Sequence, residues 1–416
     1  MISRDGDGLG ESTVRGSQPR TVYRRWLGQN DTVEGRNGAD DRTIGVEEEL
    51  LLVDPDSGVP QAVSVDVIRY AYEKGEVPRG DRDPQVGSSG GESLETELQR
   101  EQMEVCTRPC ASLAELSAQI RWARRAASQA ARGVGVAVAA LATSPVAVRP
   151  SLTPSRRYRR MADAYGLTAD EQLTCGCHVH VAVDSPEEGA AVLDRIRPWL
   201  PPLLALSANS PFWQGRDTGY DSWRHQVWGR WPSSGPTEVF ESFKEYRSTV
   251  SGMLDTGVLL DEGMVYFDAR VSHRYPTVEI RVADVCLRAE DAVLLAALVR
   301  ALVDTAVREW RAGVPPDPVR THLLRLAMWR ASRSGLRGDL VHPVTHRAAD
   351  ARAVVSALLE HAAPALIRRG DLETVERLLR RLLDRGNGAS VQRAVFTRTR
   401  DAAAVVADAV RRTLEF

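Results

Sequence analysis

The first half of the chain contains short runs in which apolar and polar residues alternate or β-branched residues cluster. Alternation with a period of two is typical of strands with one buried face, whereas short apolar runs indicate fully buried strands. These patterns predict strands at 43–53, 133–141 and 175–183, and strand pairs within 93–107. The first strand ends at the turn sequence DPDSG, residues 54–58.

Helical periodicity occurs twice in this half and then dominates the rest of the chain. Residues 113–132 follow a capping box formed by Ser112 and Glu115, and residues 193–207 form a second expected helix. Beyond Asp284 the sequence is rich in Ala, Leu and Arg. Five further helices are expected there, at 286–312, 318–333, 350–368, 371–386 and 389–414. Strands followed by helices, without an internal repeat, favour an α+β fold.

We expect a single catalytic domain over 42–416, with a sheet-rich half at 42–285 and a helical half at 286–416. Residues 1–41 are rich in Gly, Asp, Arg and Ser and poor in apolar residues, which predicts a disordered or loosely attached tail. Residues 79–92 have the composition of a long loop.

Composition limits the classes of function. The 416 residues are 43% hydrophobic and 26% charged, and the net charge of −2 argues against nucleic acid or an anionic membrane as a partner. Only Lys74 and Lys244 are lysines, so a phosphate-binding site would rely on Arg. The five cysteines lack the spacing of a paired zinc site, and from the sequence we expect neither a signal peptide nor a transmembrane segment. We therefore expect a cytoplasmic protein.

The run Glu47-Glu48-Glu49, within the first predicted strand, is the strongest chemical signal. Side chains alternate along a strand, so Glu47 and Glu49 project from one face and Glu48 from the other. Two carboxylates about 7 Å apart on an apolar strand are unfavourable unless a cation lies between them. Mg²⁺ is the expected cation, because it prefers oxygen ligands and bridges carboxylates to phosphates. A solvated edge strand with one charged face is the alternative.

Two further segments place ionisable residues in apolar surroundings. Residues 94–105 contain Glu97 and Glu104, whose spacing also fits one face of an amphipathic surface helix. In the strand at 175–183, His178 and His180 share one face. This pair would suit Zn²⁺, a Mg²⁺–phosphate site or a purely structural role, although no third soft ligand for zinc has convincing spacing.

Glu279 and Arg281 share one face of a strand at 277–284. A carboxylate beside a guanidinium suits a metal-bound phosphoryl group in transfer, and a cross-strand ion pair is the alternative.

The segment 206–232 is rich in Gly, Arg and aromatic residues. Arg216 and Arg224 are candidates for a bidentate grip on a carboxylate or phosphate. Interleaved Arg and Trp would also suit nucleic-acid stacking, which the acidic balance of the chain disfavours. Trp213 and Trp231 would otherwise line the core. No nucleotide-binding loop of the Gly-x-x-x-x-Gly-Lys or Gly-x-Gly-x-x-Gly type is present.

In this order, the segments resemble the carboxylate–amine ligase family that includes the bacterial glutamate–cysteine ligase 2 group. The matching stretches are GVEEELLLVD (45–54), ELQREQMEV (97–105), CGCHVHVAV (175–183), SANSPFWQGRDTGYDSWRHQVWGRWP (207–232), VEIRVADV (278–285) and RGNGASVQR (385–393). The resemblance covers roughly 42–400 and leaves the N-terminal segment outside. It implies the fold shared by glutamine synthetase and guanido kinases, a curved antiparallel sheet with helices on its convex side and a helical C-terminal half.

The resemblance also implies residue roles. Metal binding would involve Glu47, Glu49, Glu97, Glu104, His178 and Glu279. Nucleotide binding would involve His180 and Arg281, and catalysis would depend on Glu47, Glu279 and Arg281, with Arg281 stabilising the γ-phosphoryl group in transfer. Amino-acid substrate binding would involve Asn209, Arg216, Tyr220 and Arg224.

The implied reaction uses ATP and Mg²⁺ to phosphorylate a carboxylate, after which an amine attacks the acyl phosphate to form an amide. Its expected partners are amino-acid substrates, that is, small molecules, with glutamate and cysteine by default, and homo-oligomer formation is left open. Alternatives are a ligase for other acids and amines, a guanido-kinase-like phosphotransferase, and a binding protein that has lost catalysis. Cys106 and Cys110 lie beside an expected metal ligand without an assigned role.

Overall fold

The structure is a computed structural model, and it describes residues 42–75 and 93–415. The expected N-terminal tail (1–41) and the expected long loop (79–92) lie outside these residues. Within the described ranges, no helix has both the length and the apolar composition needed to cross a membrane.

A seven-stranded antiparallel sheet forms the centre of the described chain. Its strand order is β2-β3-β1-β5-β9-β8, and β4 pairs with the end of β1. The strands are β1 (Ile44–Val53), β2 (Ser93–Thr96), β3 (Gln102–Cys106), β4 (Ala137–Ala139), β5 (Gly176–Ala182), β8 (Ala269–Val271) and β9 (Thr277–Asp284). The expected strands at 43–53 and 175–183 and the expected strand pair within 93–107 are confirmed, whereas only three residues of 133–141 pair in the sheet.

Helices account for most of the remaining described chain. Their bounds are α2 (Ser64–Lys74), α3 (Leu113–Gly133), α4 (Arg156–Tyr165), α5 (Leu167–Asp170), α6 (Pro186–Ile196), α7 (Leu200–Ser207), α8 (Trp223–Trp228), α9 (Phe243–Asp255), α10 (Ala289–Arg311), α11 (Thr321–Ser334), α12 (Ala351–Arg369), α13 (Leu372–Arg385), α14 (Gly388–Thr399) and α15 (Ala402–Thr413). Short 3₁₀ turns are η1 (Arg197–Trp199) and η2 (Glu262–Met264), and two small hairpins pair β6 (Phe212–Trp213) with β7 (Arg216–Asp217) and β10 (Asp339–Val341) with β11 (Ala348–Asp350).

Two expected helices are each divided in the structure. The helix expected at 193–207 begins earlier, as α6, and is interrupted by η1, where Pro198 has no backbone N–H to continue the hydrogen-bond ladder. The helix expected at 389–414 divides into α14 and α15, because Arg400 adopts a left-handed φ of 56° and Asp401 caps a new helix.

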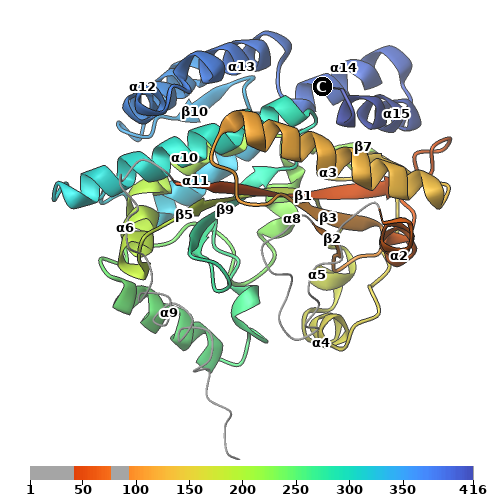
Figure 1. Ribbon diagram of the computed structural model, residues 1–416, viewed down its shortest axis with the longest axis horizontal. Coiled ribbons are helices and arrows are strands. Elements are labelled where there is room, and N and C mark those ends of the chain that lie inside the picture. Colours follow the sequence, from red (N-terminus) through yellow and green to blue (C-terminus); the bar gives the residue numbers. More distant parts are fainter. Residues whose placement is uncertain (1–41, 76–92, 416) are drawn as a thin grey trace, which may run out of the picture. The chain divides into compact units, whose positions relative to one another are not determined.

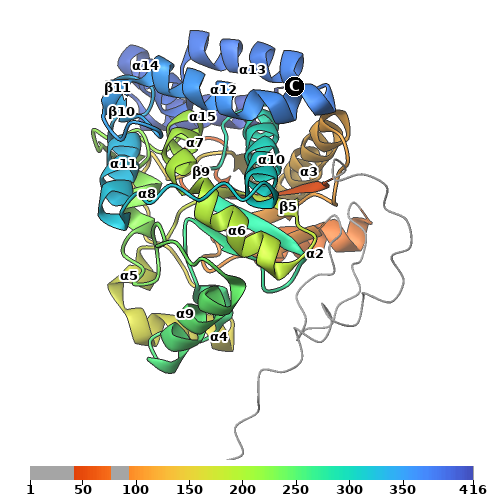
Figure 2. The same ribbon diagram turned by 90° about the vertical axis from the view of Figure 1, so that its left-hand side faces the viewer.

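The helices lie in layers on the two sides of the sheet. Figures 1 and 2 show α3 and α10 along one face, with α12 to α15 as a further layer beyond them, and α4, α5 and α9 on the opposite side. Helix α10 contacts β1 and β5, and α3 contacts β1 and β3. The sheet face beneath these helices is apolar and buried; its residues include Val46, Leu50, Met103, Val179, Val181, Val278 and Ile280.

Glu48 is the charged exception on this apolar face. Its carboxylate accepts two hydrogen bonds from Arg124 of α3, from Nη2 to Oε1 at 2.6 Å and from Nε to Oε2 at 2.9 Å. Arg124 also donates to the carbonyl oxygens of Cys286, Leu287 and Thr413. Glu48 therefore serves the architecture: its partner joins the sheet to the end of α15 and to the segment before α10.

Replacing Arg124 by Gln should destabilise the protein strongly, because it leaves Glu48 buried without its cation. Removal of one partner from a buried ion pair typically costs about 3–5 kcal/mol. Urea unfolding followed by circular dichroism measures this loss. The matched control is Arg69→Gln in the exposed Arg69–Asp66 pair, where a change below about 1 kcal/mol is expected. Similar effects of the two substitutions would contradict the role assigned to Arg124.

Candidate active site

The sheet face turned away from α3 and α10 carries a band of ionisable side chains. The strand register aligns them: Glu49 of β1 lies opposite Glu104 of β3, and Glu47 lies between Cys106 of β3 and His178 of β5. His180 of β5 lies opposite Glu279 of β9, which in turn lies opposite Arg270 of β8. The alternation expected for β1, β5 and β9 thus places residues from far-apart segments on one surface.

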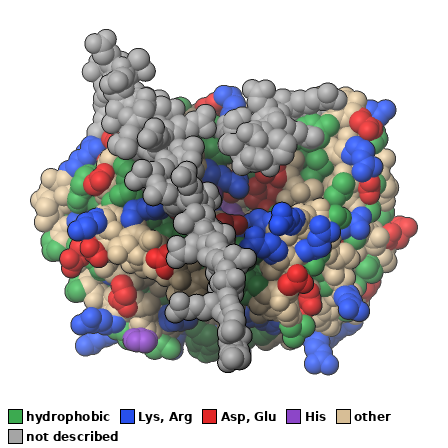
Figure 3. All heavy atoms as spheres, turned by 90° about the horizontal axis from the view of Figure 1, so that it is seen from below, with side chains coloured by type: hydrophobic (Ala, Val, Ile, Leu, Met, Phe, Trp, Pro, Cys, Tyr) green, Lys and Arg blue, Asp and Glu red, His purple; other side chains and the backbone are tan. Residues whose placement is uncertain are grey.

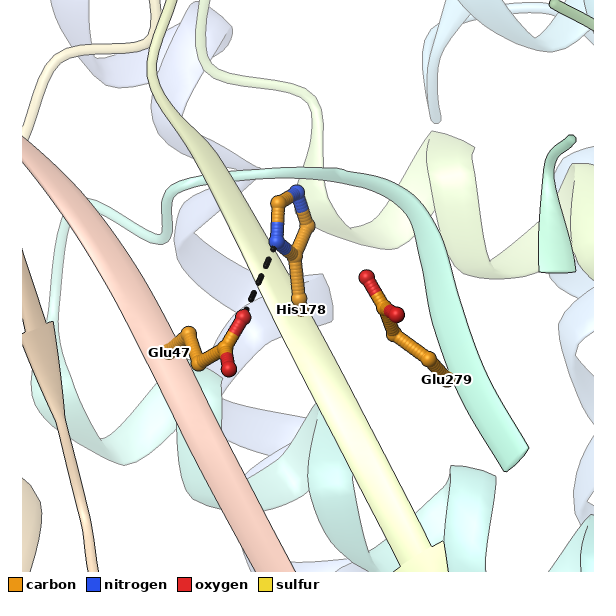
Figure 4. Close-up of side chains that lie close together, drawn as sticks. All are labelled: Glu47, His178 and Glu279. Carbon is orange, nitrogen blue, oxygen red and sulfur yellow. Dashed lines mark hydrogen bonds and ion pairs between the residues drawn. The ribbon is translucent and has the colours of Figure 1, made fainter. Parts of the chain in front are cut away.

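Two histidines contact the carboxylate of Glu47. His178 Nδ1 is 3.4 Å from Oε2, and His180 Nε2 is 3.3 Å from Oε1. Burial opposes ionisation of Glu47, but the charge of His180 and hydrogen bonds from both rings outweigh it and hold the pKa of Glu47 well below its usual range. Figure 4 shows Glu47 of β1 and Glu279 of β9 on either side of His178.

Glu279 is held by two guanidinium groups. Arg270 donates from Nε at 2.7 Å and from Nη2 at 3.2 Å, and Arg281 forms a short ion pair with the same carboxylate. Although burial disfavours its charge, Arg270 and Arg281 hold the pKa of Glu279 well below the usual value. Glu279 therefore forms two ion pairs. The pair with Arg281 lies within one strand, and the pair with Arg270 is the cross-strand ion pair that was considered as an alternative.

Among the residues that the structure describes, the acidic end of the band has no such cations. Burial, followed by the charge of Glu49, raises the pKa of Glu97 to about 8. Burial together with Glu47 and Glu97 raises the pKa of Glu104 well above its usual value. Carboxylates this close cannot all be ionised without a compensating positive charge. Glu49 differs from them because its Oε2 accepts a hydrogen bond from the backbone N–H of Gly176 at 2.5 Å.

Three groups of side chains on this face have donor atoms within 4.8 Å of one another, close enough to share a cation. They are Glu47–His178–Glu279, Glu49–Glu104–His178 and Glu47–Glu104–Cys106. His178 belongs to two of them, and its Nε2 is buried without a hydrogen-bond partner among the described residues. The first two groups offer carboxylate oxygens and one imidazole, a donor set that suits Mg²⁺ or Mn²⁺.

Cys106, to which the sequence assigned no role, lies on the same face of the sheet. Its thiol is 3.4 Å from Glu104 Oε1 and is placed to donate to it. Burial and the surrounding carboxylates raise the pKa of Cys106 well above its usual value, so the group is a neutral thiol. It is therefore a weak hydrogen-bond donor to Glu104 rather than a nucleophile.

Charge is graded across the band. Carboxylates predominate on β2, β3 and β1, histidines occupy β5, and the arginines lie on β9 and β8. Figure 3, which views the molecule from this side, shows acidic side chains near the middle and basic side chains beside them. Such a surface can hold cations at one end and an anionic group at the other.

Arg224 and Asn209 support this face rather than form part of it. Arg224 is buried and donates to the carbonyl oxygens of Arg281 and Val282 at 3.3 and 3.4 Å. A Cβ at Gly176 would lie 2.3 Å from Arg224 Nη2, so the guanidinium requires glycine there. Asn209 is fully buried, and its side-chain amide is used by three internal hydrogen bonds, which leaves no polar atom for the expected substrate contact.

The structure places Arg216 and Tyr220 outside the band. Arg216 is exposed in the β6–β7 hairpin. Tyr220 packs edge-on against Trp223 and Trp329, with the Arg333 guanidinium 5.4 Å from its ring centre. Neither forms a contact with the ionisable residues of the sheet within the described part of the chain.

Sequence reasoning missed Arg270 and Glu95. Arg270 is an alternating residue of the short strand β8, and its importance follows only from its register opposite Glu279. Glu95 of β2 lies opposite Glu104, within the acidic segment 94–105 but not among its expected ligands. Period-two alternation was visible at both places, but the pairing partners were not.

A family comparison matches nearly the whole described chain. The model of glutamate–cysteine ligase family 2 aligns with residues 43–412. A protein of Streptomyces avermitilis, whose name gives it as a candidate glutamate–cysteine ligase 2-1, is 55% identical over 372 residues, covering 89% of this chain and 99% of that protein. A Streptomyces coelicolor protein with a similar name is 56% identical over the same length and coverage.

Solved structures show the same fold at low sequence identity. A glutamate–cysteine ligase of Francisella tularensis in complex with AMP superposes with a TM-score of 0.60 and 13% identity, covering 90% of this chain and 88% of that one. The complex between a prokaryotic ubiquitin-like protein and its ligase superposes with a TM-score of 0.51 and 15% identity. The match covers 86% of this chain and 68% of that one.

The fold and the family match together define a carboxylate–amine ligase, built on the antiparallel sheet and flanking helices expected from the sequence. The chain belongs to glutamate–cysteine ligase family 2.

The acidic end of the band should make the metal-free protein less stable as pH rises. Glu97 keeps its proton more tightly in the folded than in the unfolded protein, so its contribution to stability is largest below about pH 4.5 and is lost as pH rises toward about 8. In EDTA, Glu97→Gln should reduce this decline by at most about 1.4 kcal/mol per pH unit.

Urea unfolding across this pH range measures the effect, and added Mg²⁺ should stabilise the wild type more at the alkaline end. Glu376→Gln, on an exposed position of α13, is the control. If the free energy of unfolding of Glu97→Gln depended on pH as it does in the wild type, the Glu97 carboxylate would not have a raised pKa in the folded protein.

Proposed function

We propose that the protein is an ATP- and Mg²⁺-dependent ligase that joins the side-chain carboxylate of glutamate to the amino group of cysteine through an acyl phosphate. The single observation that carries the proposal is the graded band on the sheet, with closely spaced carboxylates at one end and Arg281 at the other. The names of the relatives supply the substrate pair. The AMP in the Francisella structure supports the use of an adenine nucleotide.

The residues present fit a magnesium site. Three carboxylates and His178 converge without enough protein cations to neutralise them, and the buried Nε2 of His178 has no partner among the described residues. We propose that Glu47, Glu49, Glu104 and His178 bind Mg²⁺, with Glu97 beside them and Glu279 at the boundary with the arginines. When bound, the metal would neutralise phosphate charge and polarise the transferring group.

Each arginine of the band has a distinct proposed role. Arg281 would stabilise the charge on the γ-phosphoryl group as it passes to the carboxylate. Arg270 would hold Glu279, because its two hydrogen bonds to that carboxylate fix the orientation of the Glu279–Arg281 pair. His180 is oriented by a 2.9 Å contact between its Nδ1 and Thr277 Oγ1 and would bind nucleotide phosphate through the opposite side of its ring.

The proposed reaction has two steps. A carboxylate oxygen attacks the γ-phosphorus, the bond to the β-phosphate oxygen breaks, and ADP leaves. The amine nitrogen then attacks the acyl carbon, the carbon–oxygen bond to phosphate breaks, and the amine loses a proton. No protein nucleophile is required, which agrees with the neutral, raised-pKa thiol of Cys106.

The setting of the site supports two further parts of the proposal. We propose that 42–416 forms one catalytic domain, because α10 from the helical half packs on β1 and β5 of the sheet.

The five free cysteines, four of them buried, suit a reducing compartment such as the cytoplasm.

Incubation with ATP, Mg²⁺, glutamate and cysteine should release ADP and yield an amide product, detected by a coupled ADP assay and mass spectrometry. Omission of either amino acid or of Mg²⁺ should abolish the product. A screen of other acids and amines in the same assay determines substrate choice. Failure of every carboxylate–amine pair to give an amide would refute the ligase proposal.

Substitutions at the two ends of the band should have different effects, one on metal binding and the other on phosphoryl transfer. Glu47→Gln should raise the Mg²⁺ concentration needed for half-maximal ADP release, because it removes a charged ligand. Arg281→Met should lower kcat by about 10²–10³-fold with little change in that Mg²⁺ requirement. Glu376→Gln should behave as wild type. If Arg281→Met retained a normal kcat, the role proposed for the guanidinium would be wrong.

A further inference from the structure

A cavity of about 250 Å³ adjoins the basic end of the band. It lies between α8, α11 and the segment before β8, and Trp228, His225, Asp268, Arg325 and Met328 are among its lining residues. Trp228 links the two regions, because its ring lies 5.5 Å from the guanidinium carbon of Arg281 and also forms part of the cavity wall. This volume is below the usual range for drug-sized ligands, which suits a small molecule such as an amino acid.

Asp268 directly precedes β8, at the register position opposite Arg281. Arg270 lies opposite Glu279, so Asp268, two residues earlier, lies at the position opposite Arg281. The backbone confirms this alignment, because the N–H of Arg281 donates to the carbonyl oxygen of Asp268 at 2.9 Å. The cavity is therefore reached by continuing along the band beyond Arg281.

The carboxylate of Asp268 lacks the partners that other buried acids have. It is 4% exposed, and its Oδ2 accepts no hydrogen bond from any residue that the structure describes. By contrast, the buried Asp284 accepts hydrogen bonds from Asn209, Ser210 and Ser222. An unpaired buried carboxylate is unfavourable, so its presence at a cavity wall points to a cationic group that binds there.

Arg325 supplies the opposite charge on the same cavity. It lies on α11, is exposed, and lowers the pKa of Asp268, although burial raises that pKa overall to about 7. The two side chains form no ion pair within 4.0 Å in the described structure. A carboxylate and a guanidinium that face one small cavity without meeting are complementary to a zwitterion.

We propose that this cavity binds the head group of an α-amino acid, with the ammonium on Asp268 and the α-carboxylate on Arg325. The inference rests on the proposed function and deepens it, because it assigns the head group of the acid substrate to this cavity. The side-chain carboxylate of a dicarboxylic amino acid is then left to extend past Trp228 toward Arg281. In this proposal, the segment before β8 binds the amino-acid substrate, in place of the hairpin at 212–217.

Calorimetric titration of the full chain with L-glutamate, in the presence of Mg²⁺ and a non-hydrolysable ATP analogue, tests the cavity directly. N-acetyl-L-glutamate lacks the ammonium group, and L-glutamate 1-amide lacks the α-carboxylate. Each should bind the wild type about tenfold or more weakly than L-glutamate, the factor expected when a hydrogen bond to a charged group is lost. Equal affinity for all three compounds would overturn the proposal.

Two variants assign the contacts. Asp268→Asn should lose the preference for L-glutamate over the N-acetyl compound, and Arg325→Gln should lose the preference over the 1-amide. In steady-state kinetics, Asp268→Asn should raise KM for glutamate about tenfold or more while kcat changes far less. Arg330→Gln on α11 and Asp255→Asn at the end of α9 are matched controls, and both should retain the wild-type preferences.

Thermal unfolding without ligand separates a binding role from a structural one. Neutralising an unpaired buried carboxylate should leave Tm unchanged or raise it, whereas loss of a structural carboxylate would lower it. A lower Tm combined with retained discrimination by Asp268→Asn would overturn the proposal. If wild type makes the amide but Asp268→Asn keeps its KM and preferences, the cavity assignment fails while the ligase proposal stands.

Discussion

The charge of a carboxylate buried in this sheet has to be compensated, and the way in which each carboxylate is compensated organises the site. Glu48 receives its cation from Arg124, which ties the sheet to distant parts of the helical half. Glu279 receives two, from Arg270 and Arg281. Glu104 and Glu97 receive none from the described part of the chain, and burial together with the neighbouring carboxylates raises their pKa values. The unmet requirement at the acidic end is what makes the sheet a metal-binding surface in the proposed function.

Antiparallel pairing converts local alternation into this arrangement. The functional face takes its ionisable side chains from several strands, each of which contributes only a few, and the opposite face is apolar against α3 and α10 apart from Glu48. A shift of one residue in any strand would exchange the two faces. The ion pair of Glu48 and the apolar packing on one side therefore fix the register that aligns the acids, histidines and arginines on the other.

Much of the site could be predicted because alternation is a local property. The faces of Glu47, Glu49, His178 and Glu279 follow from their own strands, and so does the separate position of Glu48. Arg270 could not be found this way, since its role depends on which strand lies beside it. The contacts of Asn209 could not be predicted, because a polar residue in a Gly-rich loop looks the same in sequence whether it binds substrate or, as its amide does here, the protein's own backbone. The division of α14 from α15 at Arg400 likewise depends on a single backbone conformation.

Gly176 has no side chain, and the position of the charged side chain of Arg224 depends on this absence. Its missing side chain provides the space in which Arg224 lies, and that guanidinium donates to the carbonyl oxygen of Arg281. Its N–H simultaneously donates to Glu49. Any larger residue would have to displace Arg224 of α8. Residue 176 therefore connects the acidic part of the band, through Glu49, with its basic part, through Arg224 and Arg281.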